Sequence, residues 1–266
     1  MLDHNVPRVA GRVPSAEATD RNRWFVDHVE KPAAELEDFL RGTDLSLTGA
    51  RVLDVGCGDG FIDIGLLRKF QPTKVMGVDL VPTDVDELQK LYVANFNEEL
   101  PKNLTFGTCT PTTIPLPDES FDVVFSWSVF EHVTDPVAVF NEMHRLLRPG
   151  GFMFLQIWPL YRSQRGSHLW NWYPDGWEHM TRSHDELRDE IRLTLQNEPE
   201  LLEATSIDFD SLNCITVDEL QSALSSAGFK IRRVSFQADT IDVPESLLRY
   251  RLSDLAISGV KLLATR

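Results

Sequence analysis

Short apolar-rich runs alternate with longer amphipathic stretches along most of this chain. The short runs favour buried strands, and the stretches with helical spacing favour helices. The predicted strands are 51–55, 74–79, 104–106, 121–126, 152–157, 229–236 and 257–264, and the predicted helices are 61–70, 85–96, 136–147 and 216–227. Strands that alternate with helices indicate an α/β protein with a mostly parallel sheet.

Signals at the ends of several elements agree with this division. Pro72 closes the first of these helices, because proline cannot continue a helix. Asp135 and Pro136 are typical of an N-cap followed by a first helical residue. Thr216 and Glu219 have the spacing of a capping box.

The N-terminal region has a different character. Residues 1–20 combine proline, glycine and small polar residues without periodicity, which predicts a loose arm. Helical spacing follows, and Pro32 is predicted to divide two helices before Gly42 ends the second. We therefore expect residues 1–45 to form an arm and a helical cap over the sheet.

The main domain is predicted to span residues 46–266. Residues 158–213 are predicted to be an insertion, because an α/β sheet needs only one crossover between the strands at 152–157 and 229–236. This insertion holds four of the six tryptophans and two of the four tyrosines. Such dense aromatics either fasten a lid to the core or line a pocket, and both interpretations stay open. Residues 183–195 are expected to form a polar helix with a solvated face. The candidates for substrate contact are Trp158, Tyr161, Arg162, Trp170, Trp172 and Trp177.

A glycine-rich turn joins the first strand to the first core helix. Gly56, Gly58 and Gly60 allow positive φ and close approach of a ligand to the backbone. Asp79 ends the second strand, where an acid can accept hydrogen bonds from both hydroxyls of a ribose. Phe61 occupies the place of the third glycine of the dinucleotide fingerprint, so a nucleoside without a pyrophosphate is favoured.

Composition narrows the choice of partners. Forty-one acidic residues against 26 Lys and Arg give a net charge of −15, which disfavours nucleic acid and an anionic membrane surface. Cys57, Cys109 and Cys214 lie far apart without CxxC spacing, which predicts neither disulfides nor a metal site. No apolar run approaches the roughly 20 residues that span a bilayer, and no secretory signal pattern is present. We expect a cytoplasmic protein.

Four motifs together resemble one family. VLDVGCGDG, GVDL, SFDVVFSWSVFEHV and RLLRPGG are similar to the class I S-adenosylmethionine-dependent methyltransferases of the type 11 group, well over about 48–158 and more weakly over 213–266. The resemblance implies a Rossmann-like sheet of seven mostly parallel strands in the order 3-2-1-4-5-7-6, with helices on both faces. It also implies S-adenosylmethionine as the cofactor.

The resemblance implies roles for individual residues. Asp54 and the glycine turn would lie against the amino-acid part of the cofactor, and Asp79 would hold its ribose. Thr108 stands where the family usually has an aspartate that binds adenine, and its hydroxyl can still accept a hydrogen bond from an amino group. The complete cofactor-binding set is Asp54, Gly56, Cys57, Gly58, Gly60, Asp79, Leu80, Thr108, Cys109, Ser126 and Trp127.

The expected reaction is methyl transfer to an oxygen, nitrogen or carbon of a small molecule. His132, His168 and His179 are the candidate bases, although for His132 a structural role is favoured, in which it ties the loop after the fourth strand to the following helix. The insertion resembles segments that roof the acceptor pocket in the family. The alternatives are a nicotinamide-dependent oxidoreductase, disfavoured by Phe61 and by the lack of a Tyr-x-x-x-Lys pair, and a non-catalytic cofactor-binding or scaffold protein.

Overall fold

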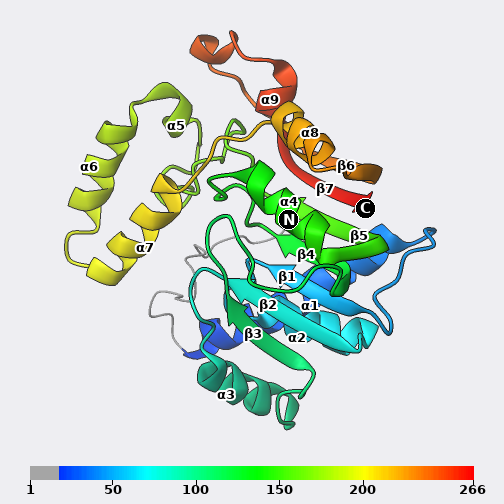
Figure 1. Cartoon of the computed structure of the whole chain (residues 1–266). Helices are drawn as coiled ribbons and strands as arrows, with labels where there is room; N and C mark the ends of the chain where they lie inside the picture. Colours follow the sequence, from blue (N-terminus) through cyan, green and yellow to red (C-terminus); the bar gives the residue numbers. More distant parts are fainter. Residues whose placement is uncertain (1–17) are drawn as a thin grey trace.

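The computed structural model describes residues 18–266. Within this range seven strands form one sheet in the order β3-β2-β1-β4-β5-β7-β6 (Figure 1). Strands β1 to β5 pair in parallel, and β7 runs antiparallel to both of its neighbours. The predicted fold and strand order are confirmed. The strands are β1 (Arg51–Val55), β2 (Lys74–Asp79), β3 (Leu104–Thr108), β4 (Phe121–Trp127), β5 (Leu147–Ile157), β6 (Lys230–Ala238) and β7 (Ile257–Thr265).

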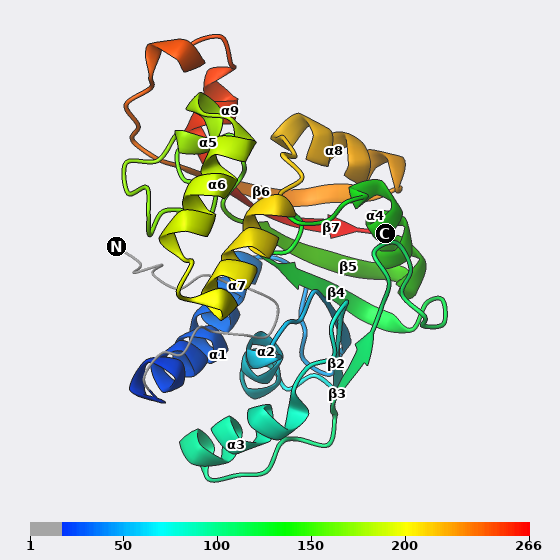
Figure 2. The same ribbon diagram turned by 90° about the vertical axis from the view of Figure 1, so that its left-hand side faces the viewer.

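Helices cover both faces of the sheet (Figures 1 and 2). They are α1 (Ala18–Leu40), α2 (Phe61–Phe70), α3 (Val85–Phe96), α4 (Pro136–Leu146), α5 (Glu178–Thr181), α6 (His184–Thr194), α7 (Pro199–Asp210), α8 (Val217–Ser226) and α9 (Leu252–Ala256), with a 3₁₀ helix η1 (Glu245–Leu247). Asp135 caps α4 and the capping box of Thr216 and Glu219 opens α8, as predicted. Among the described helices, none combines the length and the apolar character that crossing a membrane requires.

The alternation of strand side chains assigns the helices to the two faces. Val52 and Phe154 point into the core that the strands share with α1, α2 and α3. Leu53 and Leu155 point into the opposite core, against α4 and α8. Because neighbouring residues of a strand face opposite ways, a central strand buried on both sides reads as a continuous apolar run. The carboxyl ends of β1, β2 and β4 are left free for a site.

The prediction of two helices divided at Pro32 is wrong, because α1 runs unbroken from Ala18 to Leu40. A proline inside a helix removes one intrahelical hydrogen bond and costs about 3 kcal/mol. Both halves of α1 bury apolar side chains against α2, and the Val29 carbonyl approaches Gly65 so closely that a side chain there would collide with it. This packing offsets the cost of Pro32. The arm predicted for residues 1–20 falls largely on residues 1–17, which lie outside the described residues.

Residues 158–213, which were predicted to be an insertion, include a small helical unit with its own core. Helices α5, α6 and α7 stand together to one side of the sheet (Figures 1 and 2). Leu187 and Ile191 of α6 pack against Phe209 of α7 and Leu169 of the preceding loop. The polar helix predicted over 183–195 is confirmed as α6, but α7 was not predicted.

Candidate functional site

A cavity of about 360 Å³ opens at the carboxyl ends of β1, β2 and β4. Its walls come from α1, from the glycine turn, from the loops after β2, β3 and β4, and from α7. In parallel sheets this edge is where ligands bind, because neighbouring connections diverge there. Four carboxylate side chains line the cavity, and among the described residues no Lys or Arg does so. The carboxylates belong to Asp59, Asp79, Glu142 and Asp208.

The glycine turn and Asp79 form one end of the cavity. One carboxylate oxygen of Asp79 accepts a hydrogen bond from the Gly58 N–H at 2.9 Å, and the other accepts from the Leu80 N–H at 2.7 Å. The N–H groups of Gly56 and Cys57 both donate to the Val78 carbonyl, which fixes the turn on the end of β2. The Val81 N–H also donates to Asp79, at 3.4 Å, and Asp79 is partly exposed and lines the cavity.

The three glycines of the turn have positive φ but different surroundings. A Cβ atom added at Gly56 would lie 2.4 Å from a Val129 methyl carbon, and one added at Gly60 would lie 2.5 Å from the Phe106 ring. A Cβ at Gly58 would meet no atom within 4 Å. Gly56 and Gly60 are therefore required by packing, whereas Gly58 leaves space that is open to the cavity.

Two carboxylates are buried together beneath the turn. Asp54 on β1 is 2% exposed, Asp63 on α2 is fully buried, and their side chains share a hydrogen bond. Burial, and then the charge of Asp54, hold the pKa of Asp63 well above its ordinary value, which disfavours ionisation of Asp63. Burial likewise raises the pKa of the Cys57 thiol, which is therefore no nucleophile at neutral pH. Asp54 does not line the cavity, and its predicted contact with the cofactor stays a prediction.

Asp63→Asn should stabilise the protein at alkaline pH. A folded-state pKa above the unfolded value means that stability falls as pH rises from about 4 through the folded pKa, because ionisation is easier in the unfolded chain. Asparagine keeps the shape and a donor for Asp54 but removes the ionisation. We expect Tm at pH 8 to rise by roughly 2–4 °C, which is about 1 kcal/mol for a chain of this size.

Thermal melts between pH 5 and pH 8 measure this effect. The Tm difference between Asp63→Asn and the wild type should shrink as pH falls. Asp189→Asn is the control, because the Asp189 side chain is 72% exposed on α6 and should show no pH-dependent difference. Parallel pH profiles for Asp63→Asn and the wild type would contradict the protonated state of Asp63.

The loop after β4 forms the next wall of the cavity. Trp127 and Ser128 line it, and the Ser128 hydroxyl donates to the Gln156 side-chain oxygen at 2.7 Å. Ser126 is fully buried and donates to the Val55 carbonyl at 2.8 Å, which ties β4 to β1. Ser126 therefore lies beneath the wall and does not line the cavity.

Thr108, the predicted adenine contact, lies outside the cavity, whereas its neighbour Cys109 lines it. Thr108 is exposed at the end of β3, pairs with Asp79 in the ladder and does not line the cavity. The cavity wall begins at Cys109, whose N–H donates to the Asp79 carbonyl at 2.9 Å, and continues to Ile114. The Ile114 N–H donates to the Glu142 carboxylate at 2.8 Å, which holds this loop against α4.

The three candidate histidines lie in different places. His132 lines the cavity, with Nδ1 2.8 Å from the Ser211 hydroxyl. His168 is buried behind it, with the two ring centroids 5.0 Å apart, and its Nδ1 is 3.2 Å from Asp208. The side chain of His179 is fully buried away from the cavity, and its Nε2 donates to the Tyr161 carbonyl at 2.6 Å.

Burial and the neighbouring His168 lower the pKa of His132 to about 4, against the opposing charge of Asp208. His132 is therefore neutral at pH 7, but its conjugate acid is too strong for efficient general-base catalysis there. The neutral imidazole of His132 can instead accept or donate a hydrogen bond, or bind a cation, in the cavity.

Two of the predicted substrate contacts interact with residues that follow β6. Trp177 lies in a cluster with Leu247, and its indole N–H donates to the Asp242 carbonyl at 3.1 Å. Arg162 forms an ion pair with Asp254 at 2.8 Å. None of the six predicted substrate contacts lines the cavity, so their role in acceptor binding stays a prediction. These six are Trp158, Tyr161, Arg162, Trp170, Trp172 and Trp177.

Sequence reasoning missed several cavity residues. Ile207, Asp208 and Ser211 bring the insertion to the cavity through α7 and its end. No signal pointed to them, because α7 mixes polar and apolar residues without a clear stripe. His28 of α1 also lines the cavity, and only its spacing after Trp24, four residues earlier on the same helix face, could have indicated it.

In a comparison with known sequences, the central part of the chain matches one protein family. Residues 53–155 match the family described as "Methyltransferase domain". The ubiquinone biosynthesis O-methyltransferase of Ruegeria pomeroyi is 31% identical over 131 residues, which cover 49% of this chain and 50% of that protein. The protein of the same name from Xanthomonas oryzae is 37% identical over 142 residues, covering 50% and 55%. The chain thus spans about half the length of the curated relatives it matches.

Solved structures share the whole fold. An S-adenosylmethionine-dependent methyltransferase from Mesorhizobium loti superposes with a TM-score of 0.53 at 17% identity, covering 86% of this chain and 96% of that one. At this identity the likeness concerns the fold alone. It extends beyond residues 53–155, because most of both chains is covered.

Proposed function

We propose that the chain is a class I methyltransferase, which transfers a methyl group from S-adenosylmethionine to a small-molecule acceptor. The family and the fold imply this cofactor. The observation that carries the proposal is the end of the cavity where Gly58 leaves open space beside the Asp79 carboxylate. A nucleoside can approach the backbone there while its ribose hydroxyls donate to Asp79.

The residues around the cavity fit this cofactor better than a nicotinamide dinucleotide. A pyrophosphate calls for cationic side chains or free N–H groups, but no Lys or Arg among the described residues lines the cavity. The Gly58 N–H is already used by Asp79. Four lining carboxylates suit a ligand with a sulfonium and an ammonium group. We assign adenine to the wall that begins at Cys109, in place of Thr108.

The reaction needs positioning more than an acid or a base. When bound, S-adenosylmethionine would supply an electrophilic methyl group and leave as S-adenosylhomocysteine, and the acceptor's proton would pass to water. The chain's task is to hold the acceptor in line, which can supply about 7–11 kcal/mol of the barrier reduction. Trp127 and Ser128 form one wall for it, and Ile207 and Ser211 of the insertion form another.

The acceptor itself is proposed only as a class. The relatives named ubiquinone biosynthesis O-methyltransferases support a small molecule with a hydroxyl group. The cavity of about 360 Å³ lies at the lower end of the size range of small-molecule sites. A net charge of −15 disfavours nucleic acid as the acceptor.

Release of S-adenosylhomocysteine tests the proposal. The purified chain should release it from S-adenosylmethionine in the presence of at least one member of a panel of phenols, hydroxy acids and amines. The methylated product is then identified by mass spectrometry. If the chain instead oxidised or reduced members of the same panel with NAD⁺ or NADH and formed no methylated product, the proposal would be contradicted.

A further inference from the structure

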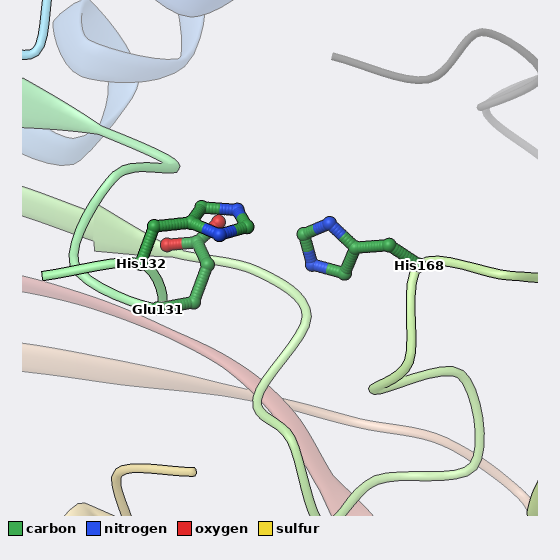
Figure 3. A group of neighbouring side chains, drawn as sticks. All are labelled: Glu131, His132 and His168. Carbon is green, nitrogen blue, oxygen red and sulfur yellow. The ribbon is translucent and has the colours of Figure 1, made fainter. Parts of the chain in front are cut away.

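Four side chains that can bind a metal converge beside the cavity, and two of them, His132 and Asp208, line it. Glu131 and His132 follow β4, His168 lies in the insertion and Asp208 is on α7. One ligand atom from each of Glu131, His132 and His168 lies within 4.8 Å of the other two. Figure 3 shows the two imidazole rings turned toward each other, with the Glu131 carboxylate beside His132. Segments far apart in the sequence thus bring imidazoles and carboxylates to one point.

Hydrogen bonds indicate which histidine nitrogens carry protons. His132 Nδ1 and the Ser211 hydroxyl share a hydrogen bond at 2.8 Å, and the same hydroxyl lies 3.1 Å from the Asp208 carbonyl. The Asp208 carboxylate accepts from His168 Nδ1 at 3.2 Å. His168 therefore carries its ring proton on Nδ1. This is the arrangement of metal-bound histidines, whose other ring nitrogen donates to a neighbouring acceptor.

A carboxylate oxygen also lies close to the second imidazole. His132 Nε2 lies 3.4 Å from Asp208 Oδ1. Two ligands of a tetrahedral cation at about 2.0–2.2 Å lie about 3.3–3.6 Å apart, so this spacing fits two ligands of one cation. Glu131 is 3% exposed and Asp208 is 7% exposed. Burying a carboxylate away from water is costly, and a divalent cation bound by both would offset that cost.

We propose that Glu131, His132 and His168, with Asp208, bind a divalent transition-metal cation at the cavity wall. Imidazole with carboxylate suits Zn²⁺, Mn²⁺ or Fe²⁺, and Zn²⁺ is the reference probe. Cysteine spacing could not have indicated this site, because it contains no cysteine and its ligands come from three separate segments.

A cation here would also specify the acceptor. This step rests on the proposed function. His132 and Asp208 line the same cavity as Asp79 and the glycine turn, so a cation held here that takes a fifth ligand would take it from the acceptor. The acceptor would then carry a hydroxyl or carboxylate oxygen at this end, which favours O-methylation over transfer to carbon.

Calorimetric titration of the EDTA-treated full chain with ZnCl₂ tests the site directly, without cofactor or acceptor. We expect one saturable site with a Kd of about 1 μM or lower, weakened roughly 100-fold or more by His168→Ala and by His132→Ala. His184→Ala is the matched control. His184 is a half-exposed histidine of the same insertion, 3.4 Å from the carboxylate of Asp210, and its loss should leave the affinity unchanged.

Two further measurements distinguish failure of the proposed metal site from failure of the proposed function. Co²⁺ bound to the wild type should give visible absorption bands of coordination by imidazole and carboxylate, which needs no variant to fold. S-adenosylmethionine binding by the EDTA-treated protein tests the proposed function separately. Binding of the cofactor without saturable binding of Zn²⁺ or Co²⁺ would overturn the metal site alone. Equal weakening of Zn²⁺ binding by His184→Ala and His168→Ala would overturn it as well.

Discussion

Gly58→Val should abolish S-adenosylmethionine binding while leaving the fold largely intact. A Cβ at Gly58 meets no protein atom within 4 Å, so the valine methyl groups would enter the space that we assign to the ligand. The positive φ of 51° adds a folding cost of about 1–2 kcal/mol. We expect the Kd measured by calorimetry to rise at least 100-fold, and Tm to fall by only a few degrees.

Gly60→Val is the matched control for this result. The two glycines belong to the same turn and both have positive φ, but a Cβ at Gly60 collides with the Phe106 ring at 2.5 Å. Gly60→Val should therefore lower Tm much more than Gly58→Val does. If Gly58→Val lowered Tm as severely as Gly60→Val and the folded fraction still bound the cofactor, the turn would be structural and the ligand would lie elsewhere.

Asp79→Ala should weaken cofactor binding at least tenfold. Two ribose hydroxyls donating to a carboxylate contribute roughly 1.5–3 kcal/mol each. The substitution also frees the Gly58 and Leu80 N–H groups, so the turn itself loses two hydrogen bonds. The expected loss is therefore nearer 100-fold, as measured by the calorimetric Kd.

Asp84→Ala controls for the loss of a nearby carboxylate. Asp84 caps α3 by accepting from the Glu87 N–H at 3.0 Å and does not line the cavity. Its replacement should cost about 1 kcal/mol of stability and leave the cofactor Kd within about threefold. An unchanged Kd for a folded Asp79→Ala would remove Asp79 from the ribose site.

The elements that sequence reasoning predicted well are those with strong local signals. The strand runs around Leu53 and Val124 are continuous because both faces of a parallel sheet are buried, and the caps at Asp135 and Thr216 are local hydrogen-bonding devices. The glycine turn combines both kinds of signal. This is why the end of the cavity near Asp79 could be placed before the structure was known.

Long-range packing was not predictable in the same way. Pro32 stays inside a continuous helix only because α1 is held against α2 along its length. The tryptophans of the insertion were natural candidates for a pocket by composition, but Trp172 and Trp177 lie in clusters beside the cavity. The residues that reach the cavity from the insertion, Ile207 and Asp208, belong to a helix with no clear apolar stripe.

The central claim is that this cavity binds S-adenosylmethionine at the glycine turn. Parallel calorimetric titrations of the full chain with S-adenosylmethionine, S-adenosylhomocysteine and NAD⁺ test it most directly. We predict one site for each of the first two ligands, weakened at least 100-fold in Gly58→Val, and no measurable heat with NAD⁺. Binding of NAD⁺ in preference to both adenosyl compounds, or failure of folded wild-type protein to bind any of the three, would contradict the claim.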